Sequence, residues 1–211
     1  MLFVRLVVTL LACAFLLSGC FPGGGSGRLI EFYTLEYAPP AFEGPGTDEI
    51  VKLDRFSSVR SYDSTAMQYM PAAYKVDAYN YHRWRTNPGD MVTDYLLRDF
   101  RHSGLFRAVF SYRQPELARF AVDGGVEEFV EAREANGWNA VLGLNVTLLD
   151  LNQSDVTERV MFQKRYRVVQ PIDGESPEFF ATGMSAAMAR ISAQIIGDVS
   201  SAVKARGGQK P

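Results

Sequence analysis

The residues with the clearest chemistry lie near the N-terminus, around Cys20. Leu17-Ser18-Gly19-Cys20 places small residues directly before a cysteine, after an unbroken apolar run from Leu6 to Leu17 and a short start that contains Arg5. This three-part pattern is typical of an export signal that a peptidase cleaves immediately before a lipidated cysteine. We therefore expect residues 1–19 to be a signal peptide and the Cys20 thiol to carry a diacylglyceryl group, which would anchor the mature chain on a membrane.

The alternative for the same segment is a transmembrane anchor. A membrane-spanning helix needs about 20 apolar residues, whereas this run stops at Leu17 and is followed by Ser-Gly-Cys and a glycine-rich stretch. Each buried CH2 group of an acyl chain contributes about 0.8 kcal/mol, so two or three chains hold a protein durably on a bilayer. Phe21 stands where an Asp would favour retention at the inner membrane, and this favours the periplasmic face of the outer membrane.

The rest of the chain offers little for catalysis or metal binding. Cys13 leaves with the signal peptide, so Cys20 is the last cysteine, and neither a disulfide nor a thiolate metal site can form. The two histidines, His82 and His102, belong to no HExxH motif and no cluster with metal-ligand spacing, so we expect structural roles for both. The run 183–187, GMSAA, partly resembles a GxSxG nucleophile elbow but lies inside a predicted helix, where the geometry fails. We expect no enzymatic activity, no cofactor and no metal site.

Charge and aromatic content bear on possible partners. The formal net charge of −2 becomes more negative when Arg5 is removed, and no nucleic-acid partner is expected. Two groups of side chains each allow two structural interpretations. Arginines at four nearby positions could face anionic lipid or a partner, or could be a solvated helix face. Aromatic residues crowded into one stretch could form an interface or half-buried strands. The arginines are Arg98, Arg101, Arg107 and Arg113, and the aromatics are Tyr62, Tyr69, Tyr74, Tyr79, Tyr81 and Trp84.

The elements that must position these residues form one predicted domain, residues 28–206. We expect residues 20–27 to be a glycine-rich flexible tether that begins with the lipidated Cys20, and residues 207–211 to be a disordered tail. Residues rich in β-branched and aromatic side chains predict strands, and a Pro/Gly stretch at 38–47 predicts a loop. The predicted strands are 28–37, 49–59, 74–84 and 106–112, a strand through Phe120, Val122 and Val126 with a bulge at Gly124-Gly125, and a hairpin of 138–148 and 160–168 that turns at 150–155.

Two helices have clear start signals. Asn87 is a predicted N-cap with Pro88 at the first helical position, and this helix ends at Gly104. Ser176 and Pro177 begin the last helix, along which one face is apolar. That face carries Phe180, Met184, Met188, Ile191, Ile195 and Val199. The sequence therefore predicts an α+β fold, a largely antiparallel sheet with two main helices packed on it.

Four short motifs, taken in order, give the chain a family resemblance. They are Phe32-Tyr33-Thr34-Leu35; Tyr62-Asp63-Ser64 with Met67-Gln68-Tyr69; Tyr81-His82-Arg83-Trp84 with Asn87-Pro88; and Ser103-Gly104-Leu105-Phe106. In this order they resemble the ABC-type transport auxiliary lipoproteins, which accompany lipid transporters of the mammalian-cell-entry (MCE) type, including the paraquat-inducible system.

The resemblance implies a non-enzymatic adaptor at the periplasmic face of the outer membrane. Its partners would be MCE-domain and ABC transporter subunits that move phospholipid or other hydrophobic cargo, and a ring-like homo-oligomer is compatible with this role. Either the motif residues contact a partner, or they fix a loop against the first helix, which is the role that turn-forming Asp and Ser and helix-starting Pro favour. These residues are Tyr62, Asp63, Ser64, Met67, Tyr69, Tyr81, Trp84 and Pro88. The alternative functions are a lipid- or ligand-binding periplasmic carrier and, more remotely, an envelope hydrolase.

Overall fold

The computed structural model describes residues 28–135 and 137–207. Residues 1–27, with the expected signal peptide, Cys20 and the tether, lie outside the described residues, as do residues 208–211. The strands are β1 (Glu31–Tyr33), β2 (Thr47–Leu53), β3 (Ser57–Ser58), β4 (Ala66–Ala72), β5 (Lys75–Trp84), β6 (Phe106–Ser111), β7 (Phe120–Glu134), β8 (Gly137–Asp150) and β9 (Val160–Pro171). The helices are the 3-10 turn η2 (Arg60–Tyr62), α2 (Pro88–His102), α3 (Val156–Arg159) and α4 (Pro177–Gly207).

The described residues form one nine-stranded sheet organised around β7. Along one edge β7 pairs with β2, β3 and β4 in succession, all parallel, through Val51 with Phe120, Ser57 with Gly125, and Tyr69 with Glu131. Along its other edge β7 pairs antiparallel with β8, and β8 pairs antiparallel with β9. β6 flanks β2, and β5 and then β1 flank β4.

The α+β class is confirmed, but the sheet is mixed rather than largely antiparallel. The predicted hairpin of β8 and β9 is antiparallel, whereas β2, β3 and β4 run along β7 in its own direction. Parallel neighbours need a crossover connection, usually helical. α2 lies in the connection between β5 and the later strands β6 and β7, and so provides that crossover.

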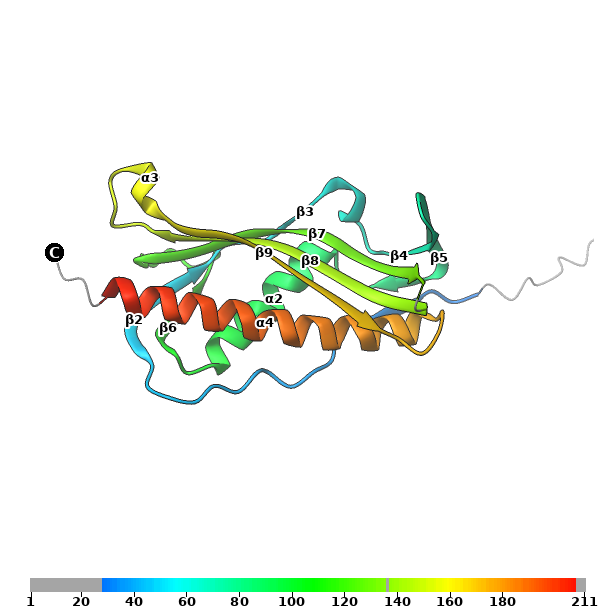
Figure 1. Ribbon diagram of the computed structural model, residues 1–211, viewed down its shortest axis with the longest axis horizontal. Helices are drawn as coiled ribbons and strands as arrows, with labels where there is room; N and C mark the ends of the chain where they lie inside the picture. The colour runs from blue at the N-terminus through cyan, green and yellow to red at the C-terminus, as the bar shows by residue number, and fades with distance from the viewer. Residues whose placement is uncertain (1–27, 136, 208–211) are drawn as a thin grey trace, which may run out of the picture.

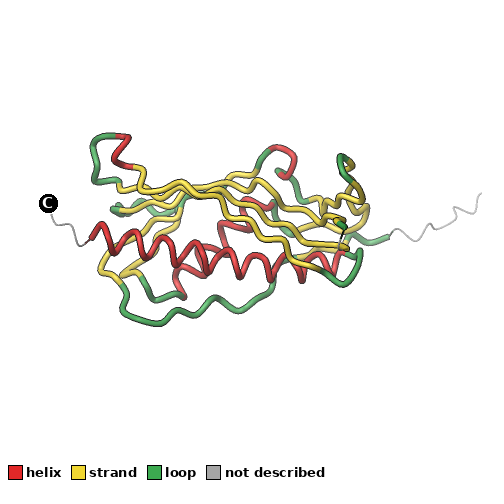
Figure 2. The backbone as a smooth tube through the Cα atoms, viewed as in Figure 1, coloured by secondary structure: helices red, strands yellow, loops and turns green. Residues whose placement is uncertain are grey.

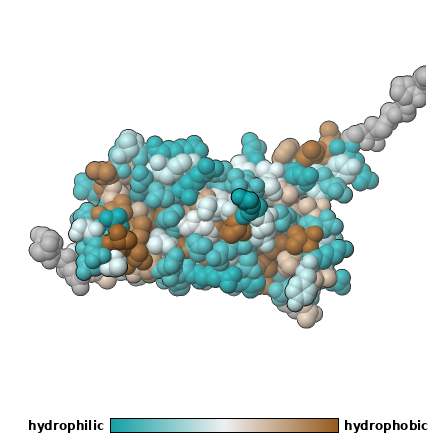
Figure 3. Space-filling model, turned by 90° about the horizontal axis from the view of Figure 1, so that it is seen from above, coloured by the Kyte–Doolittle hydropathy of each residue, from teal (hydrophilic) through white to brown (hydrophobic). Residues whose placement is uncertain are grey.

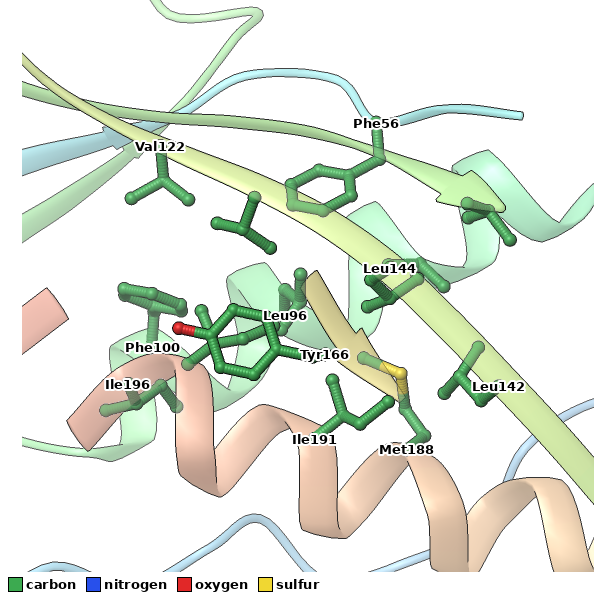
Figure 4. Packing of buried hydrophobic residues seen from close by; sticks show 14 of the residues in the cluster. Phe56, Leu96, Phe100, Val122, Leu142, Leu144, Tyr166, Met188, Ile191 and Ile196 are labelled. Atoms are coloured by element: carbon green, nitrogen blue, oxygen red, sulfur yellow. The ribbon is translucent and has the colours of Figure 1, made fainter. Parts of the chain in front are cut away.

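Both long helices cover the same face of the sheet (Figure 1, Figure 2). The apolar face predicted on the last helix is confirmed, since all six of its residues are fully buried. Alternate residues of β8 from Ala140 to Leu148 are fully buried opposite it, as the pattern predicts. Met188 and Ile191 of α4 point toward Leu142, Leu144 and Tyr166 of the sheet (Figure 4). The opposite face of the sheet is largely hydrophilic (Figure 3).

Both helix starts are confirmed in atomic detail. The Asn87 side chain accepts a hydrogen bond from the Asp90 amide at 2.9 Å, and Pro88 is the first residue of α2. Ser176 Oγ accepts a hydrogen bond from the Phe179 amide at 3.1 Å at the start of α4. α4 continues to Gly207, the first residue of the predicted tail. At about 1.5 Å per residue, its 31 residues extend for about 46 Å.

The segment 34–46, which we call the strap, is where the strand prediction for 28–37 fails. Only Glu31–Tyr33 pairs as a strand; the strap then runs irregularly along the helix layer (Figure 2). Side chains of the helices satisfy its backbone: Tyr95 donates to the Leu35 carbonyl, and Ser185 Oγ accepts from the Glu36 amide at 3.0 Å. With these partners, the strap needs no neighbouring strand.

Two further differences concern β7 and its parallel neighbours. The bulge lies at Glu127, between Val126 and Glu128, rather than at Gly124-Gly125. Gly124 instead allows a close approach, because a Cβ there would lie 2.6 Å from Cε1 of Phe56. Phe56 is buried where the chain leaves the sheet, and this splits the predicted strand 49–59 into β2 and β3. β4 was not predicted.

Candidate functional site

The family-motif residues do not converge on one surface. Met67 and Trp84 are fully buried, and Pro88 is buried at the first position of α2. The Trp84 ring makes edge-on contacts with Phe129 and Phe180, with ring centroids 5.2 and 5.1 Å apart. In this chain these three residues therefore pack the core between the sheet and the two helices.

The Tyr62-Asp63-Ser64 motif forms a turn beside the start of α2. Tyr62 is half-buried at the end of η2, and Ser64 Oγ accepts a hydrogen bond from the Ala66 amide at 3.3 Å. Asp63 and Asn87, the N-cap of α2, line the same hollow, which has a volume of about 250 Å³. This arrangement agrees with the interpretation that the motif fixes a loop against the first helix.

The remaining motif residues, Tyr69 and Tyr81, lie toward one end of the molecule, which we call the β1 end. It consists of residues 28–33 with β1, the β4–β5 hairpin and the first turn of α4, and it is at the right of Figure 1. The other end, which we call the α3 end, consists of α3, the loop 112–119 and the last turns of α4. Polar and aromatic side chains gather at the β1 end, which makes it the candidate site.

Tyr33 is at the centre of one cluster at the β1 end. Its hydroxyl lies 2.7 Å from Oε1 of Glu178, 2.9 Å from Oε2 of Glu31 and 3.1 Å from Nδ1 of His82. Parallel pairing of β1 with β5 places Glu31 beside His82, and Glu178 comes from the first turn of α4. The cluster therefore joins the sheet edge to the start of the long helix.

The second cluster at this end is aromatic, around a buried carboxyl. Tyr79 donates to Oε2 of Glu131 at 2.7 Å, and its ring lies 4.9 Å from that of Tyr69. The Tyr69 ring lies 6.5 Å from that of Trp138. Glu131 is fully buried, and burial raises its pKa from 4.5 to about 7.

The protonation states of the two tyrosines in these clusters follow from their surroundings. Burial and the hydrogen bonds to Glu178 and Glu31 raise the pKa of Tyr33, while the hydrogen bond from Tyr33 lowers the pKa of Glu178. Burial and the bond to Glu131 raise the pKa of Tyr79 likewise. A tyrosine that acts as a base at neutral pH needs a lowered pKa. These phenols are therefore hydrogen-bond donors to their carboxylates.

Other candidate residues have internal partners. Arg98 stacks on the rings of Tyr37 and Tyr95, and Arg101 donates to the Val109 carbonyl, so these two are not a free basic face. Ser185, from the GMSAA run, donates to the Ala181 carbonyl inside α4, as one expects of a helical serine. Nδ1 of His102 lies 2.8 Å from the Arg98 carbonyl. No group of three or more potential metal ligands occurs among the described residues.

The sequence reasoning missed the exposure of apolar residues at the β1 end. Ile30 and Phe32 lie in the stretch 28–37, which was predicted as a strand from its β-branched and aromatic residues, yet they are 53% and 65% exposed. The sequence did carry a hint of this exposure, because both residues follow the predicted tether within a few positions. In the part of the chain that the structure describes, no helix is both long enough and apolar enough to cross a bilayer.

The motifs, the two-helix layer and the mixed sheet can now be compared with known proteins. Residues 33–196 match the family model described as ABC-type transport auxiliary lipoprotein component. The chain belongs to this family. It is an auxiliary lipoprotein component of an ABC-type transport system, and the family places it in the cell envelope.

Solved structures share the fold at low sequence identity. Protein XCC0632 from Xanthomonas campestris, of family DUF330, superimposes with a TM-score of 0.74 at 19% identity, over 85% of this chain and 99% of that one. The hypothetical protein CT253 from Chlamydia trachomatis gives a TM-score of 0.52 at 12% identity, over 75% of this chain and 99% of that one. No curated protein sequence matches the chain.

Proposed function

We propose that this protein is held at the periplasmic face of the outer membrane by acyl chains on Cys20. There it acts as a non-enzymatic adaptor of an MCE-type ABC transport system that moves phospholipid or other hydrophobic cargo between membranes. The observation that carries the proposal is the family match over residues 33–196, which includes the sequence motifs from Tyr33 onward. The signal and cysteine at 1–20 supply the anchor that an adaptor at a membrane needs.

The packing of the core favours an adaptor over a lipid carrier. A carrier of this architecture would keep its ligand between the helices and the sheet, but that space is filled by fully buried side chains such as Leu96, Leu144 and Ile191 (Figure 4). A hollow on the outer face of the sheet, beside Met70 and Val130, has a volume of about 310 Å³. That is at the lower limit of small-molecule pockets, about 300–1,000 Å³, and is small for a lipid with two acyl chains.

The anchor is tested by metabolic labelling with an alkyne fatty acid. We expect label in the wild-type chain and in the Cys13→Ala variant, whose cysteine lies in the signal, and none in Cys20→Ala. Fractionation of the two membranes should then place the labelled protein in the outer membrane. Label that persists in Cys20→Ala, or a protein that fractionates with the inner membrane, contradicts the proposed anchor or its location.

The adaptor role is tested by cross-linking in cells, followed by purification and mass spectrometry. We expect MCE-domain and ABC transporter subunits to be recovered with the wild-type chain and to be strongly reduced with Cys20→Ala expressed at the same level. Recovery of no envelope transport subunit contradicts the adaptor role.

Native mass spectrometry of the delipidated domain decides between adaptor and carrier, since a carrier retains bound lipid. The same measurement gives the oligomeric state, and we expect a ring-like homo-oligomer.

A further inference from the structure

The β1 end carries exposed apolar side chains directly after the tether. Leu29 is 87% exposed, Ile30 53%, Phe32 65% and Tyr81 40%. The Arg28 guanidinium lies 5.3 Å from the centre of the Tyr81 ring, and pairing of β1 with β5 keeps these segments side by side. Figure 3 shows hydrophobic residues gathered where the N-terminal trace meets the described part of the molecule. We call Leu29, Ile30, Phe32 and Tyr81 the apolar tip.

The alternation of a strand explains why these side chains point outward. Successive side chains of a strand point to opposite faces. Glu31 and Tyr33 are on the face that meets His82 and Glu178, where they make the hydrogen bonds of the first cluster. Phe32 is therefore on the opposite face and stays exposed, and Ile30, directly before the strand, is exposed as well. Contiguous exposed apolar residues mark interaction surfaces.

We propose that the apolar tip inserts into the interfacial layer of the lipid bilayer that holds Cys20. This inference rests on the proposed acylation of Cys20. The chain advances by eight residues from Cys20 to Arg28, which is at most about 29 Å when fully extended and about 16 Å on average for a glycine-rich coil. The anchor therefore keeps the tip beside the membrane surface, where even a weak contact is intramolecular and highly populated.

The chemistry of the tip fits a bilayer. Leucine, isoleucine and phenylalanine side chains suit the boundary between head groups and acyl chains, and tyrosine is frequent at the membrane interface. Arg28 adds a cation that attracts anionic head groups. A second copy of this chain or a partner protein could cover the same residues, and the experiment below distinguishes these occupants from lipid.

A position-matched fluorescence experiment tests the proposal. Cys13 and Cys20 are the only cysteines of the sequence, and the acylated Cys20 cannot react with a maleimide. A single new cysteine in the acylated protein is therefore a unique labelling site. The variants are Leu29→Cys at the tip and Leu117→Cys at the α3 end, since both leucines are exposed, at 87% and 94%. Each labelled protein is reconstituted into vesicles of phosphatidylethanolamine and phosphatidylglycerol that contain a nitroxide-labelled lipid.

We expect quenching at position 29 to be at least three times that at position 117. Replacing the neighbours by Ile30→Ser and Phe32→Ser should at least halve the quenching at 29, while circular dichroism stays unchanged because both side chains are exposed. Equal, weak quenching at both positions, in protein that floats with the vesicles, overturns the proposal and leaves the anchor intact. Self-quenching of label at 29 without lipid quenching also overturns it, since a second copy then covers the tip. Protein that fails to float contradicts the acylation itself.

Discussion

Asp99 is a buried carboxylate that holds three elements together. It lies on α2, is fully buried, and accepts hydrogen bonds from Tyr37 of the strap at 2.7 Å and from Ser192 of α4 at 2.6 Å. Arg98 provides the counter-charge at 2.8 Å. Burial and the bond to Asp99 raise the pKa of Tyr37, so its phenol remains a donor at neutral pH. Asp99 therefore links Tyr37 of the strap to both long helices, beside the contacts that Tyr95 and Ser185 make with the strap backbone.

Replacing this carboxylate should be costly. Asp99→Ala leaves the buried hydroxyl of Ser192, the half-buried hydroxyl of Tyr37 and an arginine without their acceptor, and we expect a loss of about 3 kcal/mol in the free energy of unfolding. Tyr37→Phe removes one hydrogen bond and should cost about 1 kcal/mol. Urea titration followed by circular dichroism measures both. Asp94→Ala, at an exposed position of the same helix, should change stability by less than about 0.5 kcal/mol; an equal loss for Asp94→Ala would contradict the assignment.

Glu131 makes stability depend on pH. Its carboxyl has a raised pKa of about 7 in the folded protein, against 4.5 when unfolded, so the folded state holds the proton more tightly. Stability should therefore be greatest below pH 4.5 as far as this group is concerned, and fall by up to about 3 kcal/mol as the pH rises to 7 and above. Glu131→Gln cannot ionise, and its amide oxygen can still accept the hydrogen bond from Tyr79.

The measurement is the free energy of unfolding of both proteins between pH 4.5 and 8. The difference between Glu131→Gln and wild type should grow in favour of the variant across this window. Glu134→Gln, an exposed position at the end of the same strand, serves as the control and should follow the wild-type profile. Parallel profiles for Glu131→Gln and wild type would show that the buried carboxyl is not the source of the pH dependence.

α4 approaches the sheet closely at one glycine and not at another. A Cβ at Gly183 would lie 2.3 Å from Cγ2 of Ile172 and 2.9 Å from Cβ of Ala140, whereas at Gly197 it would meet no described atom within 4 Å. Alanine stabilises a helix by about 0.5–1 kcal/mol relative to glycine, and overpacking costs about 1–3 kcal/mol. We expect Gly197→Ala to raise the free energy of unfolding by about 0.5 kcal/mol and Gly183→Ala to lower it by about 1 kcal/mol.

The two substitutions share one helix and one chemical change, so their difference isolates packing against β8. Thermal unfolding followed by circular dichroism measures both variants. Two stabilised variants would mean that α4 stands further from Ala140 than the structure places it.

Elements whose limits are set by neighbours in the sequence could be predicted. Asn87, Pro88 and Ser176 determine where α2 and α4 begin, and the alternation in β8 identifies its buried face, because these signals act within a few residues. The strap and the bulge at Glu127 depend on distant groups, namely helix side chains that bind the strap and a β8 partner opposite the bulge. Such dependence leaves no local pattern to detect.

The features of the candidate site also differ in whether neighbouring residues or distant groups determine them. The prediction at Cys20 rests on four adjacent residues and lies outside the described part of the chain, and most of the aromatic residues of 62–84 lie on the β4–β5 hairpin. Exposure is different, because a residue is buried or exposed according to what packs against it. Met67 and Trp84 are buried, while Phe32 is exposed, although all three belong to strands. The β-branched and aromatic composition of 28–37 is the same in either case.

The described part of the molecule is elongated, with the β1 end and the α3 end at opposite ends of its long axis (Figure 1), and each end carries exposed apolar residues. At the α3 end Leu117 is 94% exposed and Val156 is 69% exposed. The Leu151 amide donates to the Arg119 carbonyl at 2.7 Å, and this hydrogen bond joins the segment before α3 to the end of the loop 112–119. In the orientation proposed above, with the β1 end at the membrane, the α3 end would point into the periplasm, about the length of α4 away. An adaptor needs a partner surface there.

This geometry predicts which positions contact transport subunits in cells. A photo-cross-linking amino acid at position 117 or 156 should capture an MCE-domain or ABC transporter subunit, because both apolar side chains face away from the membrane. The same amino acid at position 29 should give mainly lipid adducts. Gln163, exposed on β9, is the control and should give at least five-fold less captured protein, as measured by immunoblot and mass spectrometry. Capture of a transport subunit from position 163 but not from 117 or 156 would move the partner surface to the hydrophilic face of the sheet, and the apolar residues of the α3 end would then need another occupant.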